Sequence, residues 1–231
     1  MIHAKSTGRI IGLLLLVQLA GLIVPFVLLL PMTTTDFLAN AAANTSQIRL
    51  ALLLLLVNCA LTIGISIVTY PVFREYNSAM ALLLVVVSVI MFSLQAVDNV
   101  HLISMLSLSE QYVKAGGSEE LFQTLSVVVR STRRWAHYSE LLIIDTWIFL
   151  LYSLLYRFRL VPRVLAGFGL ITVLLHFTAI PLPLLLGYSS VTLLGVPMAF
   201  SHISLAIWLL AKGLDEGHYL LSAMAHALKQ T

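Results

Sequence analysis

Six apolar stretches, each long enough to cross a membrane as a helix, dominate this sequence. Crossing a hydrocarbon core about 30 Å thick takes roughly 20 residues at a rise of about 1.5 Å each. Backbone groups in lipid must pair within their own segment, so each stretch is expected to form a helix and not a strand. The chain is therefore predicted to be an all-α, polytopic bundle of six transmembrane spans. The stretches are residues 10–30, 50–70, 79–106, 138–156, 164–186 and 191–211.

Composition excludes a water-soluble globule. Apolar residues make up 60% of the 231 positions and charged residues 10%, whereas soluble domains carry about 45–50% and about 25%. The single cysteine, Cys59, excludes an internal disulfide. We expect one integral membrane domain over residues 1–231, with the lipid bilayer as its partner and a homo-oligomer or another membrane protein as an alternative partner.

The longest segment between spans, residues 107–137, is predicted to be an outer loop. Gly116 and Gly117 should interrupt any helix there. Apolar residues then recur at helical spacing, which predicts an amphipathic helix on the outer membrane surface that runs into the fourth span or bends before it. After the last span, residues 212–231 are expected to form a cytoplasmic tail. The apolar positions of the interfacial helix are Leu121, Phe122, Leu125, Val128 and Val129.

The basic residues favour an orientation with both termini in the cytoplasm. If the N-terminus is inside and six spans follow, eight Lys and Arg residues lie inside and five lie outside, and an excess of basic residues marks the cytoplasmic side. The inside set is Lys5, Arg9, Arg74, Arg157, Arg159, Arg163, Lys212 and Lys229.

Three strings carry a family resemblance: RIIGLLLL at 9–16, RFRLVPRVLAGFG at 157–169 and SHISLAIWLLAKG at 201–213. They resemble a bacterial membrane protein family known as domain of unknown function 4386, in which a Val-Pro-Arg turn and a closing Leu-Ala-x-Trp-Leu-Leu-x-Lys-Gly helix recur. The resemblance implies a small bundle in the bacterial inner membrane and supplies no activity. Pro162 would end a helix and Arg163 would anchor the cytoplasmic interface.

Ionisable side chains inside spans are costly, so each is a candidate functional group. Asp98, His101, His137, Glu140 and Asp145 lie on two consecutive antiparallel spans. A rise of about 1.5 Å per residue puts Asp98 and Asp145 each about 13 Å below the outer surface. We expect them to face each other, and the five residues to share an outward-opening pocket that binds a small ligand or a proton.

Two other interpretations of these residues are open. Asp98 and His101 are three residues apart, as are His137 and Glu140, so each pair shares a helix face. Such nitrogen and oxygen donors could hold zinc, manganese or iron. Alternatively, the groups form only a structural network of ion pairs and hydrogen bonds, with Arg133 or Arg134 pairing the acids.

Two histidines, His176 and His202, lie near the middle of the fifth and sixth spans. Facing histidines on neighbouring helices can hold a haem. The alternative is a hydrogen bond from each histidine to a neighbouring helix.

Several function classes are excluded by the motifs that the sequence lacks. It has no phosphate-binding loop, no His-Glu-x-x-His and no Gly-x-Ser-x-Gly, and no lysine within a span that could hold retinal. Its basic residues sit at membrane edges, so nucleic-acid binding has no support. A membrane protein that binds or conducts a small ligand or proton is the leading hypothesis. The alternatives are a membrane-embedded metal-dependent enzyme acting on a lipidic substrate and a non-catalytic subunit of a membrane complex.

Overall fold

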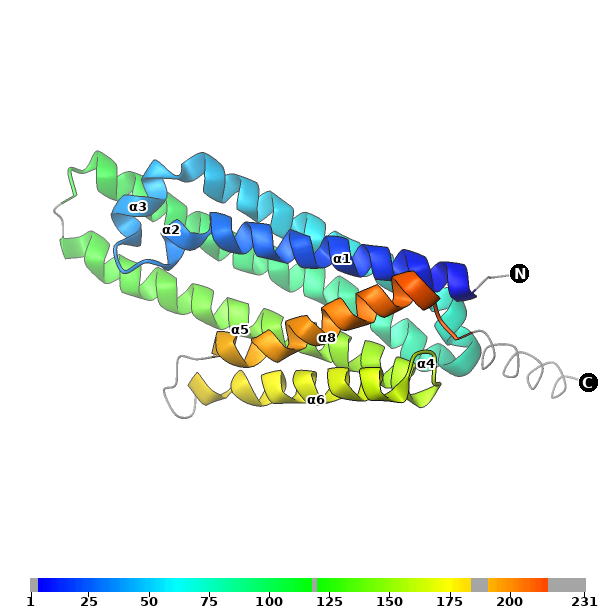
Figure 1. Cartoon of the computed structure of the whole chain (residues 1–231). Coiled ribbons are helices and arrows are strands. Elements are labelled where there is room, and N and C mark those ends of the chain that lie inside the picture. The colour runs from blue at the N-terminus through cyan, green and yellow to red at the C-terminus, as the bar shows by residue number, and fades with distance from the viewer. Residues whose placement is uncertain (1–3, 118–119, 184–190, 216–231) are drawn as a thin grey trace, which may run out of the picture. The chain divides into compact units, whose positions relative to one another are not determined.

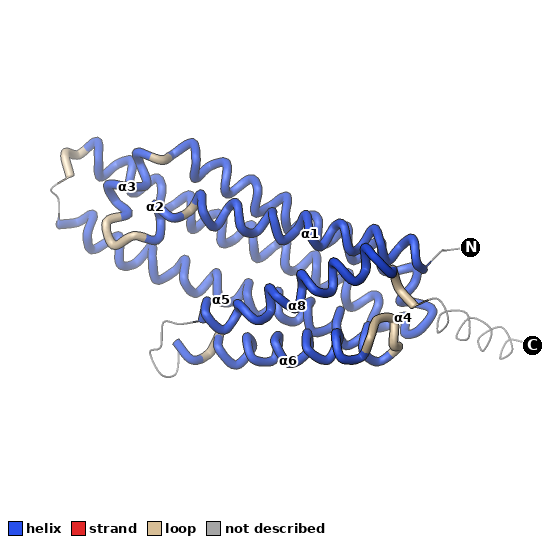
Figure 2. Tube along the Cα trace, viewed as in Figure 1, coloured by secondary structure: helices blue, strands red, loops and turns tan. Residues whose placement is uncertain are grey.

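The computed structural model describes residues 4–117, 120–183 and 191–215, and within these ranges the chain is helix and loop without a strand (Figures 1 and 2). The prediction of an all-α fold is therefore confirmed. Four of the described helices contain a stretch long and apolar enough to cross a membrane, and α6 is a shorter apolar helix. The seven described helices are α1 (Ala4–Leu28), α2 (Leu30–Thr33), α3 (Phe37–Ala43), α4 (Thr45–Lys114), α5 (Glu120–Arg157), α6 (Arg163–Ala179) and α8 (Val191–Lys212).

Helix α4 consists of two limbs that meet at Asn77. A straight helix of 70 residues would be about 105 Å long at 1.5 Å per residue, more than three times the thickness of the hydrocarbon core. At Asn77 the backbone leaves the helical region, with φ −159° and ψ 100°. The Asn77 Oδ1 atom accepts a hydrogen bond of 3.0 Å from the Met80 N–H, so Asn77 caps the second limb.

Contacts between the limbs show that they run antiparallel. In one part of the helix the Ser66 hydroxyl lies 3.5 Å from the Leu84 carbonyl oxygen. Farther from Asn77, the Asn99 side chain donates a hydrogen bond of 3.0 Å to the Leu52 carbonyl. The predicted spans 50–70 and 79–106 thus occupy one limb each.

The helices extend past the predicted span ends between residues 107 and 137. Helix α4 continues to Lys114, and α5 runs without interruption from Glu120 to Arg157, so the amphipathic segment is the beginning of α5 and runs into the predicted fourth span. Gly116 and Gly117 form the turn, with φ values of 82° and 77°. Hydropathy marks only the part of a helix that suits lipid, and backbone hydrogen bonding carries both helices beyond it.

Other predicted segments extend past the described residues. Helix α6 ends at Ala179, and the end of the predicted fifth span at 184–186 lies outside the described residues. The predicted tail is described only up to Asp215, so its remainder, 216–231, also lies outside them.

The described residues divide into two units that share long helices, and each unit has a core of its own. The first is drawn from Met1–Leu19, Leu61–Ile90 and Leu142–Thr231, and the second from Ala20–Ala60 and Met91–Leu141. The core of the first unit includes Trp147, Leu151 and Tyr152, and that of the second includes Phe37, Ile48 and Leu102.

In the first unit, α6 packs along α8 (Figure 1), and α1 approaches α8 through two glycines four residues apart. A Cβ atom added to Gly12 would lie 2.7 Å from the Ala206 carbonyl oxygen and 2.8 Å from the Leu210 nitrogen. A Cβ atom on Gly8 would collide with the backbone of Gly213 and Leu214. Small residues at this spacing let membrane helices pack backbone to backbone.

Large apolar side chains are exposed along the helices. Val164 is 86% exposed, Leu193 71% and Ile171 68%. Such surfaces are unfavourable in water and are solvated by acyl chains in a bilayer. The fold and the composition together indicate a membrane-embedded protein.

We predict that Gly12→Ala destabilises the protein, whereas Gly64→Ala does not. Both changes add helix propensity of about 1 kcal/mol. A Cβ atom at Gly12 meets the backbone of α8, while one at Gly64 meets nothing within 4 Å. Overpacking of this kind costs about 1–3 kcal/mol, so the melting temperature in detergent should fall for Gly12→Ala only. Equal melting temperatures for the two variants would show that α1 does not pack closely on α8.

Candidate functional site

The candidate site lies in the second unit, where one face of α5 meets the second limb of α4. Arg133, His137 and Glu140 follow one another at spacings of four and three residues, so α5 presents them on a single face. Asp98 approaches this face from α4. We call these four residues the Asp98 cluster.

An ion pair between Asp98 and Arg133 forms one half of the Asp98 cluster. The Arg133 Nε atom lies 3.2 Å from Asp98 Oδ1, and Arg133 Nη2 donates a hydrogen bond of 3.4 Å to Asp98 Oδ2. The Asp98 side chain is 2% exposed and that of Arg133 26%. Despite the short distance, neither Asp98 Oδ1 nor Arg133 Nε makes a hydrogen bond, so the pair falls short of a two-pronged arginine–carboxylate bridge.

His137 and Glu140 form the other half. The His137 Nδ1 atom lies 3.5 Å from Glu140 Oε2 and 3.9 Å from Asp98 Oδ2, and it makes no hydrogen bond. One donor atom from each of Asp98, His137 and Glu140 lies within 4.8 Å of the other two. Three donors of the kind that metals prefer therefore converge.

The Asp98 cluster has a formal negative charge when both of its carboxylates are ionised. Two carboxylates, Asp98 and Glu140, are each at most 3% exposed, and Arg133 balances only one of them. With His137 neutral, the formal charge is −1. Buried charges are stable only when they are paired, so one further positive charge would complete the cluster.

The structure does not bring His101 into this group. His101 lies on the same limb of α4 as Asp98 and is partly buried, but it is not among the residues whose donor atoms converge. The pairing of Asp98 with His101 predicted from their spacing is replaced by contacts between Asp98 and α5.

Asp145 has its own partner in the first unit. The His176 Nδ1 atom lies 2.8 Å from both carboxylate oxygens of Asp145, and the two side chains are 6% and 0% exposed. This contact joins α5 to α6. Asp98 and Asp145, which we expected to face each other, thus each pair with a basic group of their own unit.

The two histidines considered for haem have separate partners. His202 Nδ1 lies 3.3 Å from the Met198 carbonyl oxygen, and its ring lies edge-on to Tyr152 at a centroid distance of 5.5 Å. His176 uses Nδ1 for Asp145. Its Nε2 atom lies 3.3 Å from where a Cβ atom on Gly195 would be, so the α8 backbone covers the side from which an iron would approach.

A family model described as Domain of unknown function (DUF4386) matches residues 10–213. The chain belongs to this DUF4386 family. No curated protein and no solved structure matches it. The resemblance seen in the sequence strings is confirmed, and since membership in DUF4386 brings no activity, the chemistry must be argued from the residues themselves.

Sequence reasoning named Arg133 or Arg134 as the partner of the acids in this DUF4386 protein, and it named Asp145 and His176 without pairing them. The spacing of Arg133, His137 and Glu140 on one helix face was a usable signal in favour of Arg133. No local pattern indicates the pairing of Asp145 with His176, because the two residues are 31 positions apart and meet only when α6 packs on α5.

We predict that Asp145 and His176 are energetically coupled. Asp145→Asn or His176→Gln alone leaves a buried polar partner unsatisfied, and breaking a buried ion pair from one side costs about 3–5 kcal/mol. The double variant should be less destabilised than the sum of the single variants, with a coupling of about 0.5–3 kcal/mol. The measurement is a double-mutant cycle on unfolding in detergent. Combining Asp145→Asn with His202→Gln is the control and should be additive, and additivity of both combinations would contradict the pairing.

Proposed function

We propose that the chain crosses a bacterial inner membrane six times, with both termini in the cytoplasm. Six helical segments support this: α1, the two limbs of α4, α5, α6 and α8. The excess of basic residues on the side of the termini supports the orientation. At the start of α5, Phe122 and Val129 pack on the core of the second unit, while Leu121, Leu125 and Val128 are exposed. This exposed stripe is the part of α5 that would lie at the outer interface.

The topology predicts opposite reporter signals at two positions. A phosphatase, active only outside the cytoplasm, should be inactive when fused after Thr231 and active when inserted between Gly116 and Gly117. A fluorescent protein that matures only in the cytoplasm should report the reverse. Phosphatase activity after Thr231 would reject this orientation.

We propose that the Asp98 cluster is the binding site for a small cation, a divalent metal ion or a proton. The observation that carries this proposal is the convergence of three donor groups, the buried Asp98 and Glu140 and the partly exposed His137, in a cluster that lacks one positive charge when both carboxylates are ionised. Asp98 Oδ1 and His137 Nδ1 also make no hydrogen bond, which is costly for a buried polar atom unless something binds it.

Arg133 has a distinct role in this proposal. Its guanidinium already lies against Asp98, so it acts as a tethered cation that competes with an incoming one. Because the Arg133 side chain is partly exposed, it can withdraw without the penalty of a fully buried charge. If the ion pair were purely structural, no incoming cation would compete with Arg133 for Asp98.

The test is metal binding by the purified full-length protein. At a hundredfold excess over Kd, we expect Zn²⁺ or Mn²⁺ to stabilise the wild type by about 2.7 kcal/mol. The stabilisation is measured as a rise in the melting temperature. Asp98→Asn and His137→Gln should each abolish the effect. Arg133→Gln should bind the metal more tightly than the wild type, because it removes the competing charge.

His101→Gln is the matched control, since His101 lies near Asp98 in sequence but outside the converging donors, and it should behave as the wild type. If neither metal binds, the proposal requires a proton instead. In that case, liposomes containing the protein and a pH-sensitive dye should show a proton flux that Glu140→Gln abolishes. Absence of both metal binding and proton flux would refute the cation site.

One observation also favours a metal-dependent enzyme as a second candidate. Three protein donors leave further coordination positions open, as in catalytic zinc sites. An assay of the metal-loaded protein with a lipidic substrate separates the two candidates, because only an enzyme would turn the substrate over.

A further inference from the structure

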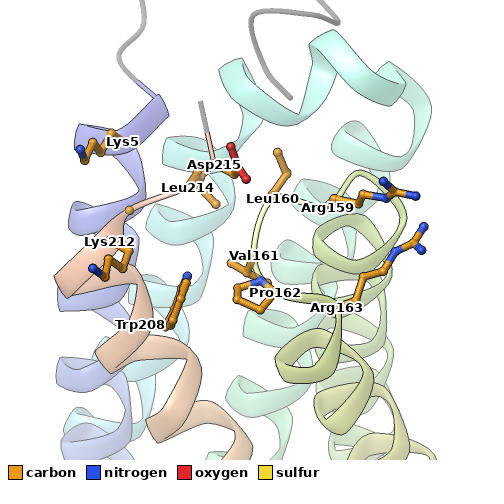
Figure 3. A pocket seen from close by; sticks show the side chains of 11 residues that line it. Lys5, Arg159, Leu160, Val161, Pro162, Arg163, Trp208, Lys212, Leu214 and Asp215 are labelled. Carbon is orange, nitrogen blue, oxygen red and sulfur yellow. The ribbon is translucent and has the colours of Figure 1, made fainter. Parts of the chain in front are cut away.

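A cavity of about 710 Å³ lies in the first unit, where the start of α1, the turn between α5 and α6 and the end of α8 meet (Figure 3). This volume lies within the range of about 300–1,000 Å³ typical of small-molecule sites. The Asp215 N–H donates a hydrogen bond of 3.0 Å to the Leu160 carbonyl, which ties the residues after α8 to the turn. We call this cavity the basic pocket.

The basic pocket is lined by both apolar and cationic side chains. Leu160, Val161 and Leu214 are at most 3% exposed, and with Trp208 they supply the apolar part of the lining. One carboxylate, that of Asp215, is outnumbered by basic side chains, so the lining favours a ligand that is anionic and also carries apolar surface. The basic side chains are Lys5, Arg159, Arg163 and Lys212.

Arg159 occupies a backbone position that normally favours glycine. Its φ is 56°, in the left-handed region that is uncommon for residues with a side chain. The Leu160 N–H bonds the Leu155 carbonyl at 3.1 Å, which is the helix-ending pattern in which glycine is usual. An arginine at this position points to a role for its side chain, because glycine would form the same turn with less strain.

Arg163 is also placed against a local preference. It is the first residue of α6, where the helix dipole favours negative and not positive side chains. Its guanidinium lies 5.7 Å from the ring of Tyr156. In Figure 3 Arg159 and Arg163 extend to the same side of the turn. Two guanidinium groups on one side of a turn suit the oxygens of a phosphate.

An apolar stripe leads away from the two arginines along α6. Val164 is 86% exposed, Phe168 43%, Ile171 68% and Leu175 40%. Their spacings of four, three and four residues place them on one side of the helix. An acyl chain lying on this stripe would start beside Arg163.

We propose that the basic pocket binds the phosphate headgroup of an anionic phospholipid, with an acyl chain along the exposed stripe of α6. Basic pockets between membrane helices recognise acidic headgroups in this way. A soluble phosphate compound carries the same charge but has no acyl chain to lie on the stripe. The proposal is independent of the Asp98 cluster, which belongs to the other unit.

The test is a titration of the full-length protein in detergent with phosphatidylglycerol, followed by native mass spectrometry. Arg159→Gly and Arg163→Gln should each weaken binding about fivefold to tenfold, since one basic group near a lipid headgroup contributes about a fivefold effect or more. Arg159→Gly suits the backbone at this turn and keeps the fold intact. Arg157→Gln is the control of equal charge change, because Arg157 lies over Phe158 and does not line the cavity.

Three results would overturn the proposal. An equal loss of binding for Arg157→Gln would indicate attraction by overall charge and no specific site. Phosphatidylcholine binding as tightly as phosphatidylglycerol would exclude recognition of the negative charge. Displacement of the lipid by millimolar inorganic phosphate would identify a soluble phosphate compound as the ligand. Unchanged lipid binding in the presence of inorganic phosphate, together with weaker binding by the two pocket variants, supports the lipid.

Discussion

The absence of water from the bilayer interior governs this structure. Backbone groups without water must bond to one another, so the described chain is helical almost throughout. The same constraint applies to side chains. Trp147 donates to Ser66 at 2.8 Å, Tyr152 donates to Ser201 at 3.3 Å, and Asp145 contacts His176. Polar groups deep in each unit thus serve as specific contacts between helices, where apolar side chains alone would discriminate poorly between one neighbour and another.

The Asp98 cluster departs from this pattern of satisfied pairs. Its atoms lie close enough for electrostatic attraction, but their alignment leaves a carboxylate oxygen and an imidazole nitrogen without hydrogen bonds. The Asp145–His176 contact, by comparison, has its nitrogen 2.8 Å from both oxygens. Two carboxylate–imidazole contacts on one helix therefore differ in kind. The compact one is suited to holding α5 against α6, and the loose one is suited to accepting a further charged species.

The sequence predicted the helices well because long apolar runs have one stable solution in lipid. It also identified Asp98, His137, Glu140 and Asp145 as costly residues that must find partners. It placed helix ends poorly around residues 107–137, since hydropathy reports the membrane boundary and not the end of hydrogen bonding. The partners themselves were the least predictable: the choice of Arg133 over Arg134, and of His176 for Asp145, depends on how helices rotate and pack, which no local spacing records.

The close approach of α1 to the end of α8 has a consequence for how the chain is assembled. Gly8 meets the backbone of Gly213 and Leu214, and Gly12 meets that of Ala206 and Leu210. Roughly 200 residues separate the partners in each contact, and their synthesis takes about 10–40 s at about 5–20 residues per second. During that interval the face of α1 that carries Gly8 and Gly12 contacts only lipid or the insertion machinery. Hairpins such as the two limbs of α4 can close as they emerge from the ribosome. The first unit is completed only when its last helix arrives, so the beginning of the chain is the part that waits longest for its partner.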